Sequence, residues 1–345
     1  MGLRDEIFEQ PAAARRLLAD PGDQIVRVAR SVADRGVRTV FLAARGSSDN
    51  AGLYAKYLWG ACNRLPIALA APSLFSVYGT PPAIADALVV GISQSGRSPD
   101  IVSVIREGRR QGALTLAVTN EPGSPLAEAA ELVIDTMAGV ERAVAATKTY
   151  TTQLVTIAML SAALADDPER RHWLGQIPAL IEDVLELDDA IAAAVAHYRG
   201  MTHCAVLGRG FNYATAFEWA LKLKELAHVI AEPYSPADFQ HGPLALAHEG
   251  FPILAVVPEG AIAGVVMELL DRLVHKERVE LLAVSNHQPA LALAHTALPL
   301  PQGLPEWLTP ILAIVPAQLF CYHLTRAKGL DTEDPRGLTK ITMTV

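Results

Sequence analysis

Short apolar runs of strand length alternate with longer stretches of helical periodicity through most of the 345-residue chain. Continuous apolar strands that are separated by helices are typical of parallel sheets covered on both faces. The pattern therefore predicts a doubly wound α/β fold. The predicted strands are TVFLAARG (39–46), PIALAAPSLFS (66–76), ALVVGISQSG (87–96), LTLAVTN (114–120), LVIDT (132–136), HCAVLGRG (203–210), FPILAVVPEG (251–260), VELLAVSN (279–286) and TALPLP (296–301).

The two halves of the chain resemble each other. One predicted strand ends at Gly46 and its counterpart at Gly210, 164 residues later; a second pair ends at Gly96 and Gly260, again 164 residues apart. A third pair, LAVTN and LAVSN, is offset by 166 residues. Three matches in order at nearly one offset predict a duplicated domain. The join should lie near DDPERRHW (166–173), where a proline and charges interrupt the apolar pattern.

Composition narrows the class of protein. With 51% hydrophobic and 19% charged residues, the chain has the composition of a compact globular protein. The start, MGLRDEIFEQ, lacks the basic and apolar regions of a signal peptide, and the longest apolar stretch (308–324) is interrupted by Pro310 and Pro316. We therefore expect a soluble, cytoplasmic protein that has no membrane as a partner.

Charge and metal-ligand patterns exclude further classes. The net charge is −8 with no long basic run, so nucleic acid is not expected as a partner. Three cysteines and ten histidines show no metal-ligand spacing, and we expect no metal and no cofactor. An anionic ligand would have to be held by local groups, because the field of the whole protein repels it.

One strand-to-helix turn, GISQSGRSPD (91–100), is the best candidate for a local anion-binding site. Helix N-terminal N–H groups favour an anion there, and Gly96 lets the backbone approach it closely. Ordinary N-capping by serine is the alternative. The second half has Val-Pro-Glu where the first has Ser-Gln-Ser, and neither turn is a nucleotide-binding loop, which favours a phosphorylated small metabolite. The candidate ligands are Ser93, Gln94, Ser95 and Ser98, with Ser47 and Ser48 after the first strand.

A second group of candidates lies in FEWALKLKELAHVIAEPYSPADFQHGPLAL (217–246). Glu218, Lys222 and Glu225 are spaced four and three residues apart, which places them on one face of a helix. A solvated face with ion pairs is the alternative on spacing alone. His241 lies in a predicted loop and is a candidate acid–base group, whereas the spacing of Lys340 near the C-terminus is that of a surface lysine.

Several of these motifs together resemble the tandem sugar isomerase (SIS) domain family. GISQSGRSPD, ATKTYTTQL, EWALKLKELAHVIAEPYSPADFQHGPLAL and DPRGLTK resemble the isomerase part of glucosamine-6-phosphate synthase and standalone SIS-type glucosamine-6-phosphate deaminases. The resemblance covers essentially the whole chain. It implies two flavodoxin-like SIS units, in line with the duplication. The expected segments are an N-terminal helical segment (1–30), SIS domain 1 (31–165), a helical linker (166–195), SIS domain 2 (196–305) and a C-terminal helix with a catalytic tail (306–345).

The resemblance also implies roles. Glu225 matches the base that moves a proton between C1 and C2, His241 the ring-opening group from a neighbouring subunit, and Lys340 the lysine that forms a Schiff base with the ketose. Lys222 and Glu218 match its polar neighbours. The matched phosphate ligands are Ser48, Ser93, Gln94, Ser95 and Ser98, and Ser47, Val144 and Ala146 fall in the sugar pocket. Three positions depart from the family pattern, namely Ser98 for Thr, Arg97 for Glu and Ala146 for Ser.

The expected reaction is conversion of glucosamine 6-phosphate to fructose 6-phosphate and ammonia, by a homodimer whose active site is shared between subunits. The motifs that resemble the isomerase part begin within the first residues of the chain, so we expect no glutaminase domain. Alternatives in the same class are a fructosamine-6-phosphate deglycase and a plain phosphosugar isomerase. A non-catalytic sugar-phosphate sensor is the alternative of another class, and the presence of Glu225, His241 and Lys340 argues against it.

Overall fold

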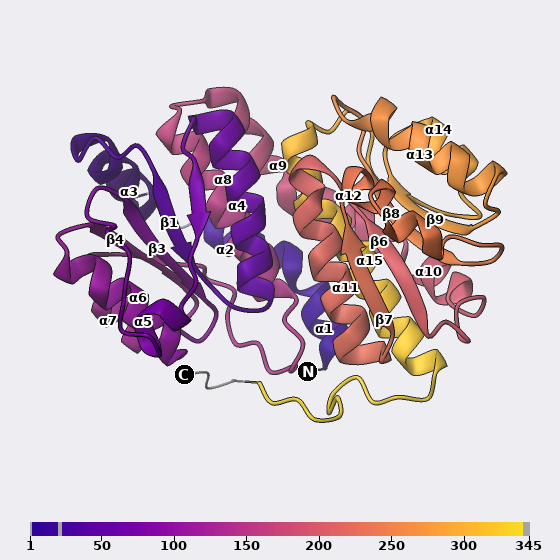
Figure 1. Ribbon diagram of the computed structural model, residues 1–345, viewed down its shortest axis with the longest axis horizontal. Helices are drawn as coiled ribbons and strands as arrows, with labels where there is room; N and C mark the ends of the chain where they lie inside the picture. Colours follow the sequence, from indigo (N-terminus) through magenta and orange to yellow (C-terminus); the bar gives the residue numbers. More distant parts are fainter. Residues whose placement is uncertain (1, 20–22, 341–345) are drawn as a thin grey trace. The chain divides into compact units, whose positions relative to one another are not determined.

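The computed structural model describes residues 2–19 and 23–340, and the chain forms two compact units (Figure 1). The N-terminal unit consists of Glu9–Glu141, Ala146–Pro178 and Thr339–Val345. The C-terminal unit consists of Met1–Phe8, Arg142–Ala145 and Ala179–Leu338. Of the described residues near the two ends, residues 2–8 thus belong to the C-terminal unit and residues 339–340 to the N-terminal unit.

The N-terminal unit contains a five-stranded parallel sheet in the order β2-β1-β3-β4-β5. This order reverses direction between β1 and β3, the arrangement of a flavodoxin-like doubly wound sheet. Every residue of the two central strands, β3 and β4, is buried, which explains their uninterrupted apolar sequences. The strands are β1 (Val40–Ala43), β2 (Ile67–Leu69), β3 (Leu88–Ser93), β4 (Leu114–Thr119) and β5 (Leu132–Asp135).

Helices cover both faces of this sheet. α4 contacts β1, β2 and β3 and packs on α8, which also contacts α2 and α3; α6 and α7 pack on the strands of the other face (Figure 1). One core cluster lies between the sheet and α6 and α7, and includes Val89, Ile105 and Leu126. The helices are α2 (Gln10–Ala19), α3 (Asp23–Asp34), α4 (Ser47–Asn63), α5 (Ser73–Ser76), α6 (Pro99–Arg110), α7 (Pro125–Ala129) and α8 (Lys148–Leu164). A further helix, α9 (Pro168–Leu185), contributes residues to both units.

The C-terminal unit repeats the same topology. Its parallel sheet has the order β10-β9-β8-β6-β7, which matches the first sheet strand for strand. The predicted α/β class and the predicted duplication into two flavodoxin-like units are confirmed. The strands are β6 (His203–Leu207), β7 (Ile230–Tyr234), β8 (Pro252–Val257), β9 (Glu280–Ser285) and β10 (Thr296–Pro299).

One long helix dominates the covering of this second sheet. α15 (Thr309–Ala327) packs on α11 and α10, while a core cluster on the opposite face joins the sheet to α13. Among the described residues, Glu306–Ala327 is the one helical stretch long and apolar enough to cross a membrane, and 94% of its apolar window is buried in the protein. The other elements are α1 (Leu3–Phe8), α10 (Asp188–Ala194), η1 (Gly210–Asn212), α11 (Tyr213–Ala227), α12 (Pro236–Gln240), η2 (Pro243–Leu246), α13 (Ala263–His275), α14 (Gln288–Leu293) and η3 (Glu306–Leu308).

Two details of the predicted elements were wrong. Only Ile67–Leu69 of the predicted strand 66–76 is extended, and the following SLFS forms the short helix α5 behind Pro72. Strand β7 was missed because its sequence, IAEPY, contains a proline and a glutamate. Such residues are tolerated at the edge of a sheet, where β7 lies with its residues only partly buried.

An ion pair and a hydrogen bond, both to Asp188, connect three helices of the C-terminal unit. Asp188 at the start of α10 accepts hydrogen bonds from Arg4 of α1 and from His323 of α15. Burial raises the pKa of Asp188, but the hydrogen bonds from His323 and Arg4 outweigh this and hold it below its ordinary value. The tail is held as well, because the Glu333 carboxylate accepts the backbone N–H of Leu3, 3.0 Å away, at the start of α1.

Candidate active site

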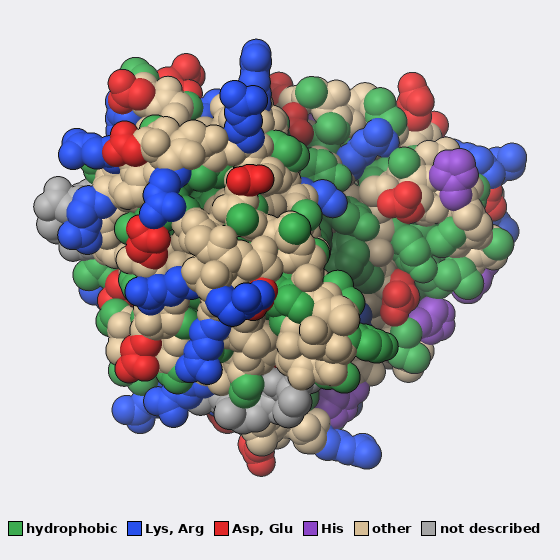
Figure 2. All heavy atoms as spheres, turned by 60° about the vertical axis from the view of Figure 1, so that its left-hand side comes forward, with side chains coloured by type: hydrophobic (Ala, Val, Ile, Leu, Met, Phe, Trp, Pro, Cys, Tyr) green, Lys and Arg blue, Asp and Glu red, His purple; other side chains and the backbone are tan. Residues whose placement is uncertain are grey.

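The candidate site of the N-terminal unit lies at the carboxyl ends of β1 and β3. In open α/β sheets the crevice at the point where strand order reverses is the usual ligand site. Figure 2 shows basic and acidic side chains interspersed over the face that it presents. With a net charge of −8, an anion at this crevice must be held by local donors.

The turn after β3 is built by its own hydroxyls and a glycine. Ser93 Oγ accepts the N–H of Gly96 at 3.1 Å, and Ser95 Oγ accepts the N–H of Arg97 at 3.4 Å. Ser98 stands at the N-cap position of α6, yet its side chain makes no cap hydrogen bond. The N-capping alternative therefore does not account for Ser98, whose hydroxyl remains available to a ligand.

Position 96 requires a glycine for two reasons, the backbone conformation and the lack of room for a Cβ atom. Its φ is +61°, and a Cβ at this position would lie 2.0 Å from Oγ of Ser124, the N-cap residue of α7. The carbonyl of Gly96 also accepts the N–H of Leu126 at 3.0 Å. The serine-rich turn is thus packed against the start of α7 and cannot shift independently of it.

The turn after β1 lies at the first residues of α4. Ser47 is half-buried, and Ser48 is buried with its Oγ accepting a hydrogen bond of 3.0 Å from Nε2 of Gln153 on α8. Since Gln153 donates in this bond, the Ser48 hydroxyl proton is directed elsewhere. Arg45 Nε lies 2.8 Å from the fully buried Asp100 at the start of α6, which ties the two turns together. Gln153, Arg45 and Asp100 were not among the residues predicted from the sequence.

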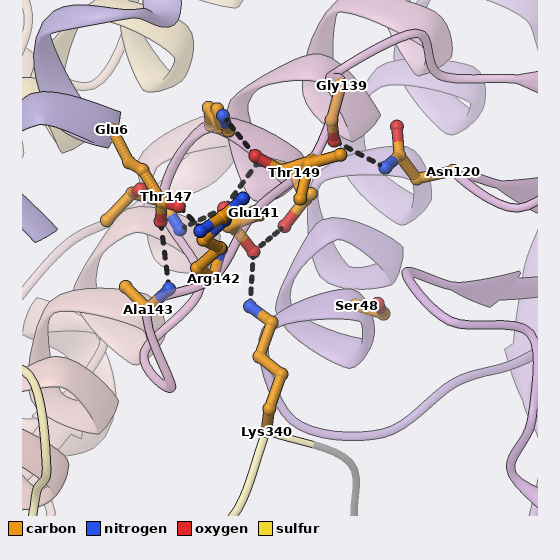
Figure 3. Close-up of polar contacts among 12 residues, drawn as sticks. Glu6, Ser48, Asn120, Gly139, Glu141, Arg142, Ala143, Thr147, Thr149 and Lys340 are labelled. Atoms are coloured by element: carbon orange, nitrogen blue, oxygen red, sulfur yellow. Dashed lines mark hydrogen bonds and ion pairs between the residues drawn. The ribbon is translucent and has the colours of Figure 1, made fainter. Parts of the chain in front are cut away.

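Lys340 makes the most informative contact of the N-terminal unit. Its Nζ lies 2.7 Å from Oε2 of Glu141, whose side chain is completely buried (Figure 3). Glu141 also accepts the Thr149 hydroxyl at 2.7 Å and the backbone N–H groups of Thr147 and Thr149, each at 3.0 Å. Lys340, which spacing alone describes as a surface lysine, is thus partly exposed and paired with a buried carboxylate.

The electrostatics of Glu141 follow from these partners. Burial raises the pKa of the Glu141 carboxyl, but the charge and hydrogen bond of Lys340 and the two backbone N–H groups outweigh burial and lower it. The carboxylate also lies at the N-terminus of α8, where the helix favours negative charge. Glu141 is therefore an anion at neutral pH.

One face of α8 connects Lys340 to the phosphate-type turns. Thr149, which holds Glu141, and Gln153, which holds Ser48, are four residues apart and lie on the same face of the helix. Their positions on α8 differ by about one turn, roughly 5.4 Å. Within a single unit, an amine and a hydroxyl-lined turn are thus held by neighbouring points of one helix.

The predicted acid–base residues belong to the C-terminal unit. Lys222 of α11 contacts Glu225 and lies 3.4 Å from Glu218, and both Lys222 and Glu218 are buried. Glu225 is 23% exposed, so the group leads from the core to the surface of the unit. Because Lys222 and Glu218 are buried, the alternative of a solvated helix face with ion pairs is wrong. His241 is exposed on the loop after α12.

Of the three pocket residues expected from the resemblance, Ser47 was described above, and the other two lie in different units. Val144 is half-buried in the C-terminal unit, where the Glu6 carboxylate accepts the N–H groups of Arg142 and Ala143 and so fixes this loop. Ala146 is half-buried in the N-terminal unit. Within residues 2–19 and 23–340, no three His, Cys, Asp or Glu side chains gather in a way that could hold a metal ion.

The equivalent turn of the C-terminal unit is filled by the protein itself. The Glu306 carboxylate accepts the N–H of Ala261 at 2.9 Å, and a Cβ on Gly260 would lie 2.3 Å from its Oε2. A Cβ on Gly210, which follows β6, would lie 3.4 Å from the same carboxylate. An internal anion thus lies at the turns that correspond to the serine-lined turns of the first unit.

Comparison with known proteins agrees with this architecture. The model of the SIS domain matches residues 35–163 and 198–326. The chain is 34% identical, over 97% of its length, to 57% of a glutamine–fructose-6-phosphate aminotransferase (isomerizing) of Gloeobacter violaceus. It therefore spans about half the length of the curated relatives that it matches.

Two solved structures are similar over nearly the whole chain. The C-terminal domain of glucosamine-fructose-6-phosphate aminotransferase from Francisella tularensis has a TM-score of 0.88 and 30% identity, covering 96% of this chain and 98% of that one. A phosphosugar isomerase candidate from Silicibacter pomeroyi DSS-3 has a TM-score of 0.86 and 33% identity, covering 96% of this chain and 100% of that one.

Proposed function

The chain belongs to the SIS domain family, and on this premise we propose that it is a phosphosugar aldose–ketose isomerase that deaminates glucosamine 6-phosphate to fructose 6-phosphate and ammonia. The observation that carries the proposal is the ion pair between Lys340 and the buried Glu141. It places the amine of Lys340 on the carboxylate that Thr149 holds, and Thr149 lies one helical turn from Gln153, which binds Ser48. An amine held in the same unit as a phosphate-type turn suits imine chemistry on a phosphosugar.

In the proposed reaction the substrate phosphate is bound by the turns after β1 and β3. Backbone N–H groups and serine hydroxyls are suitable donors for phosphate oxygens. The ligands proposed are Ser48, Ser93, Gln94, Ser95 and Ser98, with Ser47, Val144 and Ala146 beside the sugar. Alanine at position 146 offers no hydroxyl to the sugar, so specificity there depends on shape.

Glu225 acts as the base that transfers the C2 proton of the open-chain amino sugar to C1, which yields the C2 imine of fructose 6-phosphate. The buried Lys222 and Glu218 fix Glu225 from the core side. His241, exposed and close to a glycine, is proposed to open the sugar ring in the neighbouring subunit of a homodimer. Proton transfer by such groups is worth about 10²- to 10⁴-fold in rate.

Lys340 then attacks C2 of the imine, and ammonia leaves as the lysine–ketose imine forms. Hydrolysis of that imine by one water molecule releases fructose 6-phosphate and returns the lysine. The electron sink is the protonated imine, so the residues of the chain suffice for this step. We also propose a cytoplasmic location, where phosphosugars occur.

The test is to incubate the protein with glucosamine 6-phosphate and to measure ammonia and fructose 6-phosphate. Lys340→Arg keeps a cation for Glu141 but cannot form the imine, so it should lose turnover and keep fructose 6-phosphate binding. Lys328→Arg is the matched control, because Nζ of Lys328 donates to the carbonyl of Met201 at 2.6 Å in the C-terminal unit.

The outcomes separate the alternatives. Sugar interconversion without ammonia would identify a plain phosphosugar isomerase, and amine release from fructosamine 6-phosphate alone would identify a deglycase. Binding of the sugar phosphate with no turnover of any of these substrates would refute the enzymatic proposal and favour a sensor.

A further inference from the structure

Glu141 has no role in the proposed reaction so far, although it is the residue that binds the amine of Lys340. We propose that Glu141 is the positioning residue and counter-ion of Lys340, which it pairs first as an ammonium group and then as the protonated imine of the bound ketose. This inference rests on the proposed function, because it assumes that Lys340 forms the imine.

The geometry of Glu141 makes it the fixed partner of the pair. Its side chain is 0% exposed and accepts from the hydroxyl of Thr149 and from two backbone N–H groups of the α8 N-terminus. The loop before it is held as well, because Asn120 donates to the carbonyl of Gly139 at 2.8 Å (Figure 3). Lys340, by contrast, comes from the C-terminal tail and is still 23% exposed. The carboxylate therefore determines where the amine lies.

Structural capping alone does not explain the arrangement. Three of the four partners of Glu141 already satisfy the N-terminus of α8 and its loop, without Lys340. A cation is disfavoured at a helix N-terminus. A buried ion pair also adds little net stability, since desolvation offsets the attraction between the charges. A lysine at this place is accounted for if a positive nitrogen is required there.

The chemistry keeps the charges balanced at each step. Lysine ammonium and a ketone combine to give a protonated imine and water, so one positive charge faces Glu141 before and after the reaction. In the deaminating direction the Lys340 ammonium group first gives a proton to the neutral substrate imine. The resulting neutral amine attacks the protonated imine, one C–N bond forms as another breaks, and ammonia leaves with one positive charge remaining on the lysine imine. In both directions the carboxylate stabilises the cationic imine, which is the form that draws electrons from the neighbouring carbon.

The experiment compares the wild type with Glu141→Gln, Glu141→Asp and Thr149→Val. Each is incubated with fructose 6-phosphate and borohydride over a range of pH, and the reduced adduct is measured on the peptide that contains Lys340. A lost hydrogen bond to a charged group should slow trapping by Glu141→Gln about 10- to 100-fold. The alkaline limb of trapping should move to lower pH, because the imine nitrogen loses its counter-ion. Fructose 6-phosphate affinity should change by less than about threefold, since the phosphate turns are unaltered.

The other two variants separate charge from structure. Thr149→Val removes a neutral donor to the same carboxylate and should leave the pH profile unchanged. Glu141→Asp keeps the charge on a shorter side chain and should restore part of the trapping rate. It also replaces Glu141→Gln as the test variant if the latter does not fold.

Three results would overturn the inference, and they can be told apart. Trapping by Glu141→Gln with the rate and pH profile of the wild type would refute the counter-ion role while leaving the proposed function intact, as would an equal shift in Thr149→Val. Absence of any adduct on Lys340 in the wild type would refute the proposed imine, and the role of Glu141 with it.

Discussion

Substitution of Gly96 by alanine tests the geometry of the serine-rich turn most directly. The new Cβ would lie 2.0 Å from Oγ and 2.5 Å from Cβ of Ser124. Ser124 cannot simply withdraw, because its Oγ caps α7 by accepting the N–H of Ala127. The substitution therefore strains the turn and the start of α7 together.

The magnitude follows from three contributions. A left-handed conformation costs an alanine about 1–2 kcal/mol. Loss of the α7 cap costs about 1 kcal/mol, and overpacking about 1–3 kcal/mol. Gly96→Ala should thus destabilise the protein by about 3–6 kcal/mol. Gly112→Ala is the matched control, because Gly112 also has a positive φ, +86°, but nothing lies within 4 Å of its Cβ position. It should cost only about 1–2 kcal/mol.

Urea unfolding of the wild type and both variants measures the difference, and titration calorimetry with fructose 6-phosphate measures binding. Displacement of the turn should weaken phosphosugar binding at least tenfold in Gly96→Ala, whereas Gly112→Ala should bind like the wild type. If both variants unfold at the same urea concentration, the close approach to Ser124 does not restrain the turn. Unchanged sugar binding in a destabilised Gly96→Ala would refute the assignment of the turn to the phosphate.

Three further predictions address other residues of the two units. Gln153→Leu should weaken fructose 6-phosphate binding about 5- to 10-fold in calorimetry, because Ser48 loses the donor that orients its hydroxyl; unchanged affinity would contradict this role. The pKa of Asp188 is lowered in the folded protein, so its carboxylate stabilises the fold at pH values above its unfolded pKa of about 4. This contribution is lost as the pH falls through the lowered pKa of the folded protein. The stability deficit of Asp188→Asn in urea should therefore be largest near neutral pH and shrink below about pH 4; a deficit independent of pH would refute the argument. Mixing His241→Ala with Lys340→Arg subunits should restore about one quarter of wild-type activity if the site is shared in a dimer, and no restoration would show that both residues act within one chain.

The fold was largely predictable because its strands are buried on both faces. Strands such as β3 and β4 consist of consecutive buried residues, so the apolar runs alone located them, and the repeat at a nearly constant offset gave the duplication. β7 was not predictable in this way, because an edge strand that is partly exposed carries no such run. The pattern of hydrophobic residues reports burial, and it fails where a strand is not buried.

The candidate site was predictable only in part. The turn of Ser93 to Ser98 stands out in the sequence, because hydroxyls end an apolar run. Glu141 and Gln153 do not stand out, since their importance comes from contacts with Lys340 and Ser48 across 199 and 105 residues. A local signal for Glu141 existed in GVERAVAATKTY, where a single acid stands in a segment of small and apolar residues.

The Glu306 carboxylate at the turns of the second unit has a consequence for ligand stoichiometry. A carboxylate tethered to its own site acts at an effective concentration in the millimolar range or above, which free metabolites must exceed to displace it. The proposed phosphate site at the serine-lined turns of the N-terminal unit can respond to the concentration of sugar phosphate around it. The corresponding turns of the C-terminal unit stay occupied by Glu306 up to that concentration, so below it we expect the protein to bind one sugar phosphate per chain.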